Sequence, residues 1–446
     1  METSIQNITQ SLSFLQEIIN GRLKQFFQKE NAEPFNWPEL VLEQDDAPLN
    51  HFMVRHQVNV EEFVVLLLAL APHLHPNFLD KVIQQYLPNG GEFPEIGGVK
   101  GNNHRATLPT GETALFVLAG NDIHKRMEVL RYFSPDHFFA KENILVLESV
   151  KDGEPRMSGK IILQHEYVDL FTTGAVTRPG FGPDFPAKLV TTKMDWEDLV
   201  LNTKTAQPIN DIKIWLHHNA TFLNEWGMGK KIKPGFRALF YGPPGTGKTL
   251  TATLLGKQFQ KDVYRIDLSQ VVSKYIGETE KNLEKIFMKA ENKNWILFFD
   301  EADALFGKRS SVQNAHDKYA NQEVSYLLQR VEDFPGLIIL ASNFKSNLDS
   351  AFIRRFNSII YFPMPNQEER YKIWRNSIPA IAGLGEDVDL PAISRRYELN
   401  GSAIVSVIHY ASLQTIFKKS MIISREDIME GIRREYEKEE RVFSNS

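Results

Sequence analysis

The first 87 residues predict a mainly helical region. Apolar residues recur three or four positions apart through residues 5–19, which is the spacing of one face of a helix. A second helical stretch covers residues 58–70, and Pro72 is expected to end it, because proline cannot donate the hydrogen bond that continues a helix.

The next region mixes helical and extended patterns. Residues 88–111 are rich in Gly, Pro and Asn and predict a loop, after which a helical pattern returns over residues 112–133. Residues 143–163 alternate around a Lys-Asp-Gly-Glu-Pro turn, which is typical of a β-hairpin. Helices followed by a hairpin favour a winged-helix-like domain over residues 112–176, and a different small α+β adaptor fits the same pattern.

Beyond the Pro- and Gly-rich linker at residues 177–193, the pattern becomes regular. Apolar runs that read as strands alternate with helical stretches at 248–260, 279–291 and 321–333. This alternation predicts an α/β fold with a parallel sheet covered on both faces over residues 194–363, and a small helical lid over residues 364–446. The expected strands are 236–241, 262–267, 295–300, 337–341 and 358–362.

Composition excludes several classes of protein. Lysine and arginine number 51 against 56 acidic residues, so the net charge of −5 gives no general attraction to nucleic acid or to an anionic membrane. The chain has no cysteine, hence no disulfide and no thiolate metal site. The first 20 residues do not resemble a signal peptide, and the longest apolar run, residues 63–71, is too short to span a bilayer. A soluble, cytoplasmic protein with protein partners is the expectation.

Residues 242–249, Gly-Pro-Pro-Gly-Thr-Gly-Lys-Thr, carry the most specific chemistry in the chain. They fit the phosphate-binding pattern GxxxxGK[ST] between an apolar strand and a helix. In this motif backbone amides surround the phosphates of ATP, Lys248 reaches the β- and γ-oxygens, and Thr249 offers its hydroxyl to Mg²⁺. The expected nucleotide-binding residues here are Gly242, Pro243, Pro244, Gly245, Thr246, Gly247, Lys248, Thr249 and Leu250.

A second motif ends the strand at residues 295–300. Asp300 is expected to hold Mg²⁺ through water, since that ion prefers oxygen ligands. Glu301 follows it and is expected to activate the water that attacks the γ-phosphorus. Together the two motifs predict an ATP-hydrolysing enzyme.

With further segments in the same order, residues 194–446 resemble a single AAA ATPase module of the katanin, spastin and bacterial AAA type. The segments are WEDLVLN at 196–202, SKYIGETEKNLEKIF at 273–287, DEADALFGKR at 300–309, ILASN at 339–343 and LDSAFIRRF at 348–356. The resemblance implies a large α/β subdomain, a helical lid and a ring, usually a hexamer, with ATP bound between subunits.

The resemblance also implies roles for other residues. Asn343 would orient the attacking water or touch the γ-phosphate, and Arg354 and Arg355 would act on the neighbouring subunit's nucleotide. Gly401 and Ser402 would lie against the nucleotide from the lid, where serine replaces the family's alanine. The substrate-gripping pore loop would consist of Lys274, Tyr275, Ile276 and Gly277.

These expectations define an ATP-driven ring that remodels, unfolds or disassembles a protein target chosen by the N-terminal region. Bacterial ATPases that resemble this chain often accompany contractile injection systems. One alternative is an assembly scaffold or slow nucleotide switch, which would bind ATP and hydrolyse it slowly. A nucleic-acid-bound ATPase is disfavoured, because the chain lacks a stripe of Lys and Arg.

Overall fold

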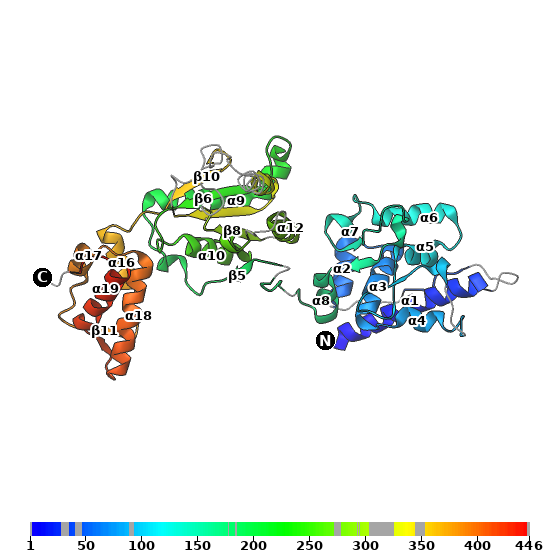
Figure 1. Cartoon of the computed structure of the whole chain (residues 1–446), viewed down its shortest axis with the longest axis horizontal. Helices are drawn as coiled ribbons and strands as arrows, with labels where there is room; N and C mark the ends of the chain where they lie inside the picture. The colour runs from blue at the N-terminus through cyan, green and yellow to red at the C-terminus, as the bar shows by residue number, and fades with distance from the viewer. Residues whose placement is uncertain are drawn as a thin grey trace. The chain divides into compact units, whose positions relative to one another are not determined.

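The computed structural model divides the chain into two compact units, residues Met1–Arg178 and Pro179–Ser446 (Figure 1). The structure describes residues 2–27, 35–40, 47–88, 93–176, 178–182, 185–271, 278–291, 293, 295–302, 325–343 and 353–443.

The first unit is built around the apolar helix α3 (Val60–Leu74), whose residues from Phe63 to Ala71 are all buried. Asn59 precedes the helix and forms a capping box with Glu62. The Asn59 side chain accepts a hydrogen bond from the Glu62 backbone amide, and the Glu62 carboxylate accepts one from the Asn59 backbone amide. The helix continues two residues past Pro72, so the predicted end was wrong. Helices that share this core are α1 (Glu2–Phe27), α2 (Pro48–His56), α4 (Phe78–Ile83) and α5 (Gly111–Ala119).

The rest of the first unit combines short helices with small antiparallel pairs. The hairpin expected at 143–163 forms, because strand β3 (Leu145–Leu147) pairs with β4 (Ile161–Leu163). A shorter pair, β1 (Val99–Lys100) with β2 (Thr107–Leu108), lies within the stretch predicted as a loop. The winged-helix assignment stays a prediction. The remaining helices are α6 (Ile123–Val129), α7 (Phe138–Lys141) and α8 (His165–Thr173), with 3-10 turns η1 (Pro94–Ile96), η2 (Leu130–Phe133) and η3 (Arg156–Ser158).

The second unit contains a six-stranded sheet in the order β10-β6-β9-β8-β7-β5. The five predicted strands form within a residue or two of their expected bounds, and all five run parallel. The sixth, an antiparallel edge strand inside the supposed linker, was not predicted from the sequence. The strands are β5 (Lys188–Val190), β6 (Phe236–Tyr241), β7 (Val263–Asp267), β8 (Ile296–Asp300), β9 (Leu337–Ser342) and β10 (Ser358–Tyr361).

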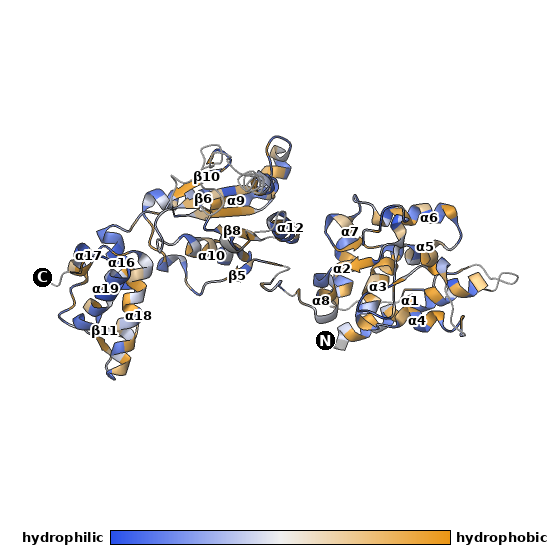
Figure 2. Cartoon of the chain, in the orientation of Figure 1, coloured by the Kyte–Doolittle hydropathy of each residue, from blue (hydrophilic) through white to orange (hydrophobic). Residues whose placement is uncertain are grey.

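Helices cover both faces of this sheet, and its strands are correspondingly apolar (Figure 2). One face packs against α9 (Thr203–Ala220) and α10 (Lys248–Phe259). The other packs against α12 (Glu278–Glu291) and the helical residues 325–333. Short elements along the unit are η4 (Trp196–Asp198), the π-helical turn η5 (Thr221–Glu225), η6 (Met228–Lys230) and α11 (Leu268–Val271).

The C-terminal part of the second unit, which we call the lid after the prediction, is helical and has its own core around the fully buried Trp374. Two-residue strands β11 (Gly383–Leu384) and β12 (Ile422–Ile423) pair in parallel beside the helices. The lid helices are α16 (Gln367–Ser377), α17 (Leu390–Arg396), α18 (Gly401–Phe417) and α19 (Arg425–Lys438). Among the described residues of the chain, no helix is both long enough and apolar enough to cross a membrane.

Candidate nucleotide site

The phosphate-binding loop joins the end of β6 to the start of α10. Gly242, Gly245 and Gly247 have φ angles of 142°, 72° and 100°, which side chains other than glycine rarely adopt. A Cβ atom at Gly242 would lie 2.1 Å from the Phe362 carbonyl oxygen, so the backbone has room only for glycine. The loop therefore directs its backbone toward the N-terminus of a 12-residue helix, where phosphate is favoured.

Lys248 lies inside this loop with 8% of its surface exposed. Its ammonium donates to the carbonyl oxygens of Gly242 at 2.6 Å and Pro243 at 3.0 Å. It also lies 3.4 Å from Oδ1 of Asn343, at the end of the adjacent strand β9. The structure thus brings together the lysine and the asparagine that sequence analysis predicted for one site.

The carboxylates end strand β8, two strands away from β6 in the sheet. Asp300 lies on the α10 face, because Ile296 and Phe298, at alternate positions of the same strand, pack in that core. Its Oδ1 accepts from the Glu301 amide at 3.1 Å, and its Oδ2 lies 2.9 Å from Nε of Arg265 in β7. Arg265 was not predicted as a site residue, since its only signal in the sequence is a charge within an apolar strand.

Glu301 has an unusual backbone. Its φ of 53° places it in the left-handed region, which costs a residue other than glycine roughly 1–3 kcal/mol. The Ala302 amide donates to the Ala341 carbonyl oxygen at 2.9 Å, so the chain is bonded to β9 directly after the turn. The side chain of Glu301 is exposed. Strain of this kind concentrates at functional sites.

The lid contacts the phosphate loop directly. Helix α18 begins at Gly401, and the Ser402 amide donates to the Gly245 carbonyl oxygen at 3.2 Å. Asn400 caps the helix by accepting from the Ala403 amide at 2.8 Å and from the Ser402 hydroxyl at 2.8 Å. The predicted Gly401 and Ser402 therefore do lie beside the loop. Asn400 was missed, although an Asn before a helical run is a capping signal.

An apolar residue lies on another side of the same loop. Leu199 belongs to the WEDLVLN segment, and its Cδ1 would be only 2.9 Å from a Cβ atom at Gly247. With the lid contact at Gly245, this gives the loop an apolar neighbour and a polar one. Such a mixture suits a nucleotide, which has an apolar base and charged phosphates.

The residues present fit ATP with Mg²⁺. The glycine-rich loop, the helix N-terminus and Lys248 would provide a site for phosphate, and the Thr249 hydroxyl and the Asp300 carboxylate are oxygen ligands of the kind Mg²⁺ prefers. Mg²⁺ would neutralise charge on the phosphates when bound. Glu301 would act as the base for the attacking water.

The arginine pair, Arg354 and Arg355, lies near the amino-terminal ends of the parallel strands, opposite the ends that bear the phosphate loop. Both residues precede β10, whose first residue Ser358 is in register with Ala238 near the start of β6. The phosphate loop begins beyond the far end of β6, and the six residues of that strand span about 17 Å. The pair is therefore not part of the site that contains Lys248, Asp300 and Asn343.

Other predicted residues fall outside the described part of the chain. These are the pore-loop residues Lys274, Tyr275, Ile276 and Gly277.

Comparison with known proteins agrees with this geometry. Residues 238–364 match the family described as ATPase family associated with various cellular activities (AAA). The chain is 32% identical over 211 residues to the 26S proteasome regulatory subunit 10B homolog A of Arabidopsis thaliana, covering 46% of this chain and 53% of that protein.

Two further proteins are similar to about the same extent. Identity is 31% over 217 residues to the proteasome-activating nucleotidase of Methanopyrus kandleri, covering 47% of this chain and 50% of that protein. Identity is 32% over 194 residues to cell division protein C of Sulfolobus acidocaldarius, covering 41% of this chain and 52% of that protein. The chain thus spans about half the length of the curated relatives it matches.

Proposed function

We propose that this chain, whose residues 238–364 match the AAA ATPase family, hydrolyses ATP in a ring of identical subunits and uses the energy to remodel, unfold or disassemble a protein. A hexamer is the expected ring. The katanin and spastin type predicted from the sequence is narrower than these matches, and it stays a prediction.

The polarity of the sheet carries the proposal. Lys248, Asp300 and Asn343 lie at or just beyond the carboxyl ends of the parallel strands, whereas the arginine pair lies where the strands begin. An arginine that precedes β10, at the opposite end of the roughly 17 Å long strand β6, cannot bring its guanidinium to the γ-phosphate of its own subunit. A second subunit that presents the amino-terminal edge of its sheet would complete the site with an arginine. An arginine in this role accelerates phosphate transfer by roughly 10³ to 10⁵.

The choice of a protein as substrate is supported by two of the relatives, whose names assign them to the proteasome as a regulatory subunit and as an activating nucleotidase. In this chain, Tyr275 of the predicted pore loop would grip an extended polypeptide by apolar contact and stacking, which tolerate varied sequences. The first unit, residues Met1–Arg178, would choose the target.

The chemistry is tested with two substitutions in the full chain. Lys248→Ala should abolish ATP binding, whereas Glu301→Gln should bind ATP normally and lose turnover, because only the second change removes the base alone. Normal kcat in the Glu301→Gln protein would exclude Glu301 from the base role. The same variant should trap bound target, and a pull-down with it would identify the protein acted on.

The arrangement between subunits is tested by mixing. Arg354→Ala subunits keep Glu301, and Glu301→Gln subunits keep the arginine pair. An interface that combines the intact halves should be active, so the mixture should exceed the mean of the two parent activities. Wild-type activity from a strictly monomeric preparation, checked by light scattering, would contradict this arrangement.

One observation favours a second candidate, the assembly scaffold or slow nucleotide switch. The Asp300 carboxylate that would hold Mg²⁺ is paired with Arg265 at 2.9 Å. If Mg²⁺ does not displace this arginine, ATP binding would not lead to fast hydrolysis. An ATPase assay with and without candidate protein targets separates the two functions, because a remodelling enzyme is stimulated by its target.

A further inference from the structure

Arg237, the second residue of strand β6, is a buried cation at the amino-terminal edge of the sheet. It is 9% exposed, and the next three residues of the strand, Ala238 to Phe240, are fully buried. Burial lowers the pKa of its guanidinium, because the charged form loses hydration. A charged group in such a place is costly unless hydrogen bonds replace the water. Its partners therefore indicate what this arginine does.

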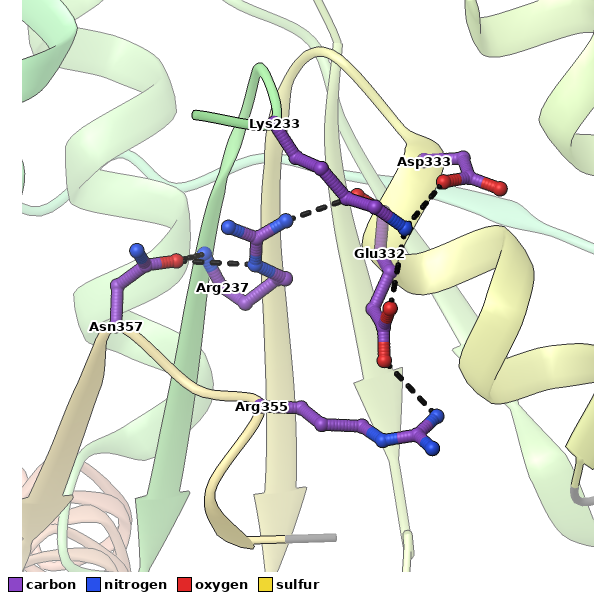
Figure 3. A network of polar contacts seen from close by, with 6 residues as sticks. All are labelled: Lys233, Arg237, Glu332, Asp333, Arg355 and Asn357. Atoms are coloured by element: carbon purple, nitrogen blue, oxygen red, sulfur yellow. Dashed lines mark hydrogen bonds and ion pairs between the residues drawn. The ribbon is translucent and has the colours of Figure 1, made fainter. Parts of the chain in front are cut away.

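Those partners belong to two segments far away in the sequence (Figure 3). Asn357 Oδ1 accepts from Nε of Arg237 at 3.0 Å and from its backbone amide at 2.9 Å. The Asn357 amide donates back to the Arg237 carbonyl oxygen at 2.9 Å. The guanidinium also donates from Nη1 to the Glu332 carbonyl oxygen at 2.9 Å. We call these three residues and their bonds the clamp.

The clamp holds the segment that carries the arginine pair. Arg355 lies two residues before Asn357, and its Nη1 pairs with the Glu332 carboxylate at 2.9 Å. Glu332 is also paired with Lys233 at 3.2 Å, so it stands between two cations (Figure 3). Arg354 is exposed, and within the described part of the chain it makes no hydrogen bond or ion pair.

We propose that Arg237 is a positioning residue for the arginine pair and that the two arginines have different roles. Arg355 anchors the segment to Glu332 of its own chain, and Arg354 extends to the nucleotide of the neighbouring subunit. This inference rests on the proposed function, since it assigns the residues that one subunit offers to the site of the next.

The chemistry of arginine suits this position. Its planar group donates from several nitrogens in fixed directions, so it bonds the Asn357 side chain and the Glu332 carbonyl at once. A lysine has a single terminal nitrogen and cannot reproduce the fork. A methionine fills a similar volume and donates nothing, leaving the Glu332 carbonyl without this donor.

The experiment uses the full-length protein with Arg237→Met. Its own phosphate loop lies at the other end of β6, so the affinity for a fluorescent ATP analogue should stay within about twofold of wild type. Its kcat should fall at least about tenfold, because small misplacements of a reacting group cost up to about 10²-fold. Arg237→Lys should recover little of the loss.

Mixing with Glu301→Gln subunits distinguishes positioning from general damage. Arg237→Met subunits keep an intact Glu301 and need only a good arginine from a neighbour. With random exchange, about one interface in four combines the two intact halves, so the mixture should reach roughly a quarter of the wild-type rate per subunit. Damage within the Arg237→Met subunit itself would not be repaired by a neighbour.

Arg370→Met is the matched control. Arg370 is 8% exposed and donates to the carbonyl oxygens of Ser394 and Pro365, so it is a buried arginine bonded to backbone in the lid. Its replacement should lower thermal stability. Mixing it with Glu301→Gln subunits should give no more than the mean of the two parents.

The outcomes separate the inference from the function on which it rests. If Arg354→Ala is rescued by mixing and Arg237→Met is not, the clamp inference is wrong and the trans arrangement stands. If neither is rescued, the trans arrangement itself is refuted.

The division of roles has its own test. Arg354→Ala should lose more kcat than Arg355→Ala, and Glu332→Gln should reproduce the Arg355→Ala loss without adding to it in the double variant. Equal losses from both arginines with a silent Glu332→Gln would overturn the division.

Discussion

Gly245→Ala tests whether the lid contact at the phosphate loop is needed to bind ATP. Gly245 has a φ of 72°, and a Cβ atom there would lie 2.2 Å from the Ser402 hydroxyl and 2.6 Å from Asn400 Oδ1. Gly227→Ala is the matched control, because Gly227 has a φ of 68° and nothing within 4 Å of its added Cβ. Both changes impose backbone strain of roughly 1–2 kcal/mol, and only the first adds the collision.

The extra cost at Gly245 can be worked from the bonds that must give way. Ordinary contact begins near 3.4 Å, so the start of α18 has to retreat by roughly 1 Å. That movement weakens two hydrogen bonds, each worth about 1 kcal/mol. One runs from the Ser402 amide to the Gly245 carbonyl oxygen, and the other runs from the Ala403 amide to the capping side chain of Asn400. A loss of 1 to 2 kcal/mol corresponds to about 5- to 30-fold weaker ATP binding.

The assay is a titration of each protein with a fluorescent ATP analogue, with thermal unfolding as the measure of stability. Both alanine variants should be slightly less stable, and Gly245→Ala alone should bind ATP more weakly. Adding Ser402→Ala removes the atom nearest to the new Cβ and should recover part of the affinity. Equal affinities for Gly245→Ala and Gly227→Ala would refute the role given to the lid contact.

Two further predictions concern other parts of the chain. Tyr275→Ala should leave basal ATP hydrolysis within a few fold of wild type while eliminating work on the protein target. Tyr275→Phe should be tolerated, because the aromatic ring makes the contact. Loss of the oligomer in Tyr275→Ala, seen by size-exclusion chromatography at matched ATP, would instead favour a packing role for this residue. Burial is the larger cause, and repulsion from His165 and His104 the smaller cause, of a pKa for His73 below the usual 6.5. The unfolded chain therefore protonates this imidazole more readily than the folded chain does. Stability should therefore fall as pH drops below about 6.5, and His73→Gln should reduce this dependence in unfolding curves measured between about pH 8 and about pH 5.

Sequence alone predicted the sheet well, because its parallel strands are continuous apolar runs that alternate with helices. It failed where the local signal was weak. Strand β5 has three residues in a stretch rich in Pro and Gly, and it forms because β7 offers it an edge. Helix α3 passes Pro72 because the preceding apolar turns are buried in the core, and this packing outweighs one lost hydrogen bond.

Some residues of the candidate site could be predicted from the sequence, and others required the structure. Lys248, Asp300 and Glu301 belong to compact motifs whose chemistry is local, so their positions followed from the sequence. The structure was needed for residues that act through distant partners. Arg237 looks like an exposed charge at a strand end, and its partner Asn357 lies 120 residues away. No periodicity or spacing in the sequence links the two.

The opposite ends of strand β6 have a consequence for inheritance. One end leads into the subunit's own phosphate loop, and the other bears Arg237, whose bonds hold a segment that would serve the adjacent subunit. A chain with a faulty arginine segment would keep its own base and silence the subunit beside it. In a cell that makes equal amounts of both versions, about half of the interfaces would lack a good arginine, and the lost sites would belong to normal and faulty chains alike.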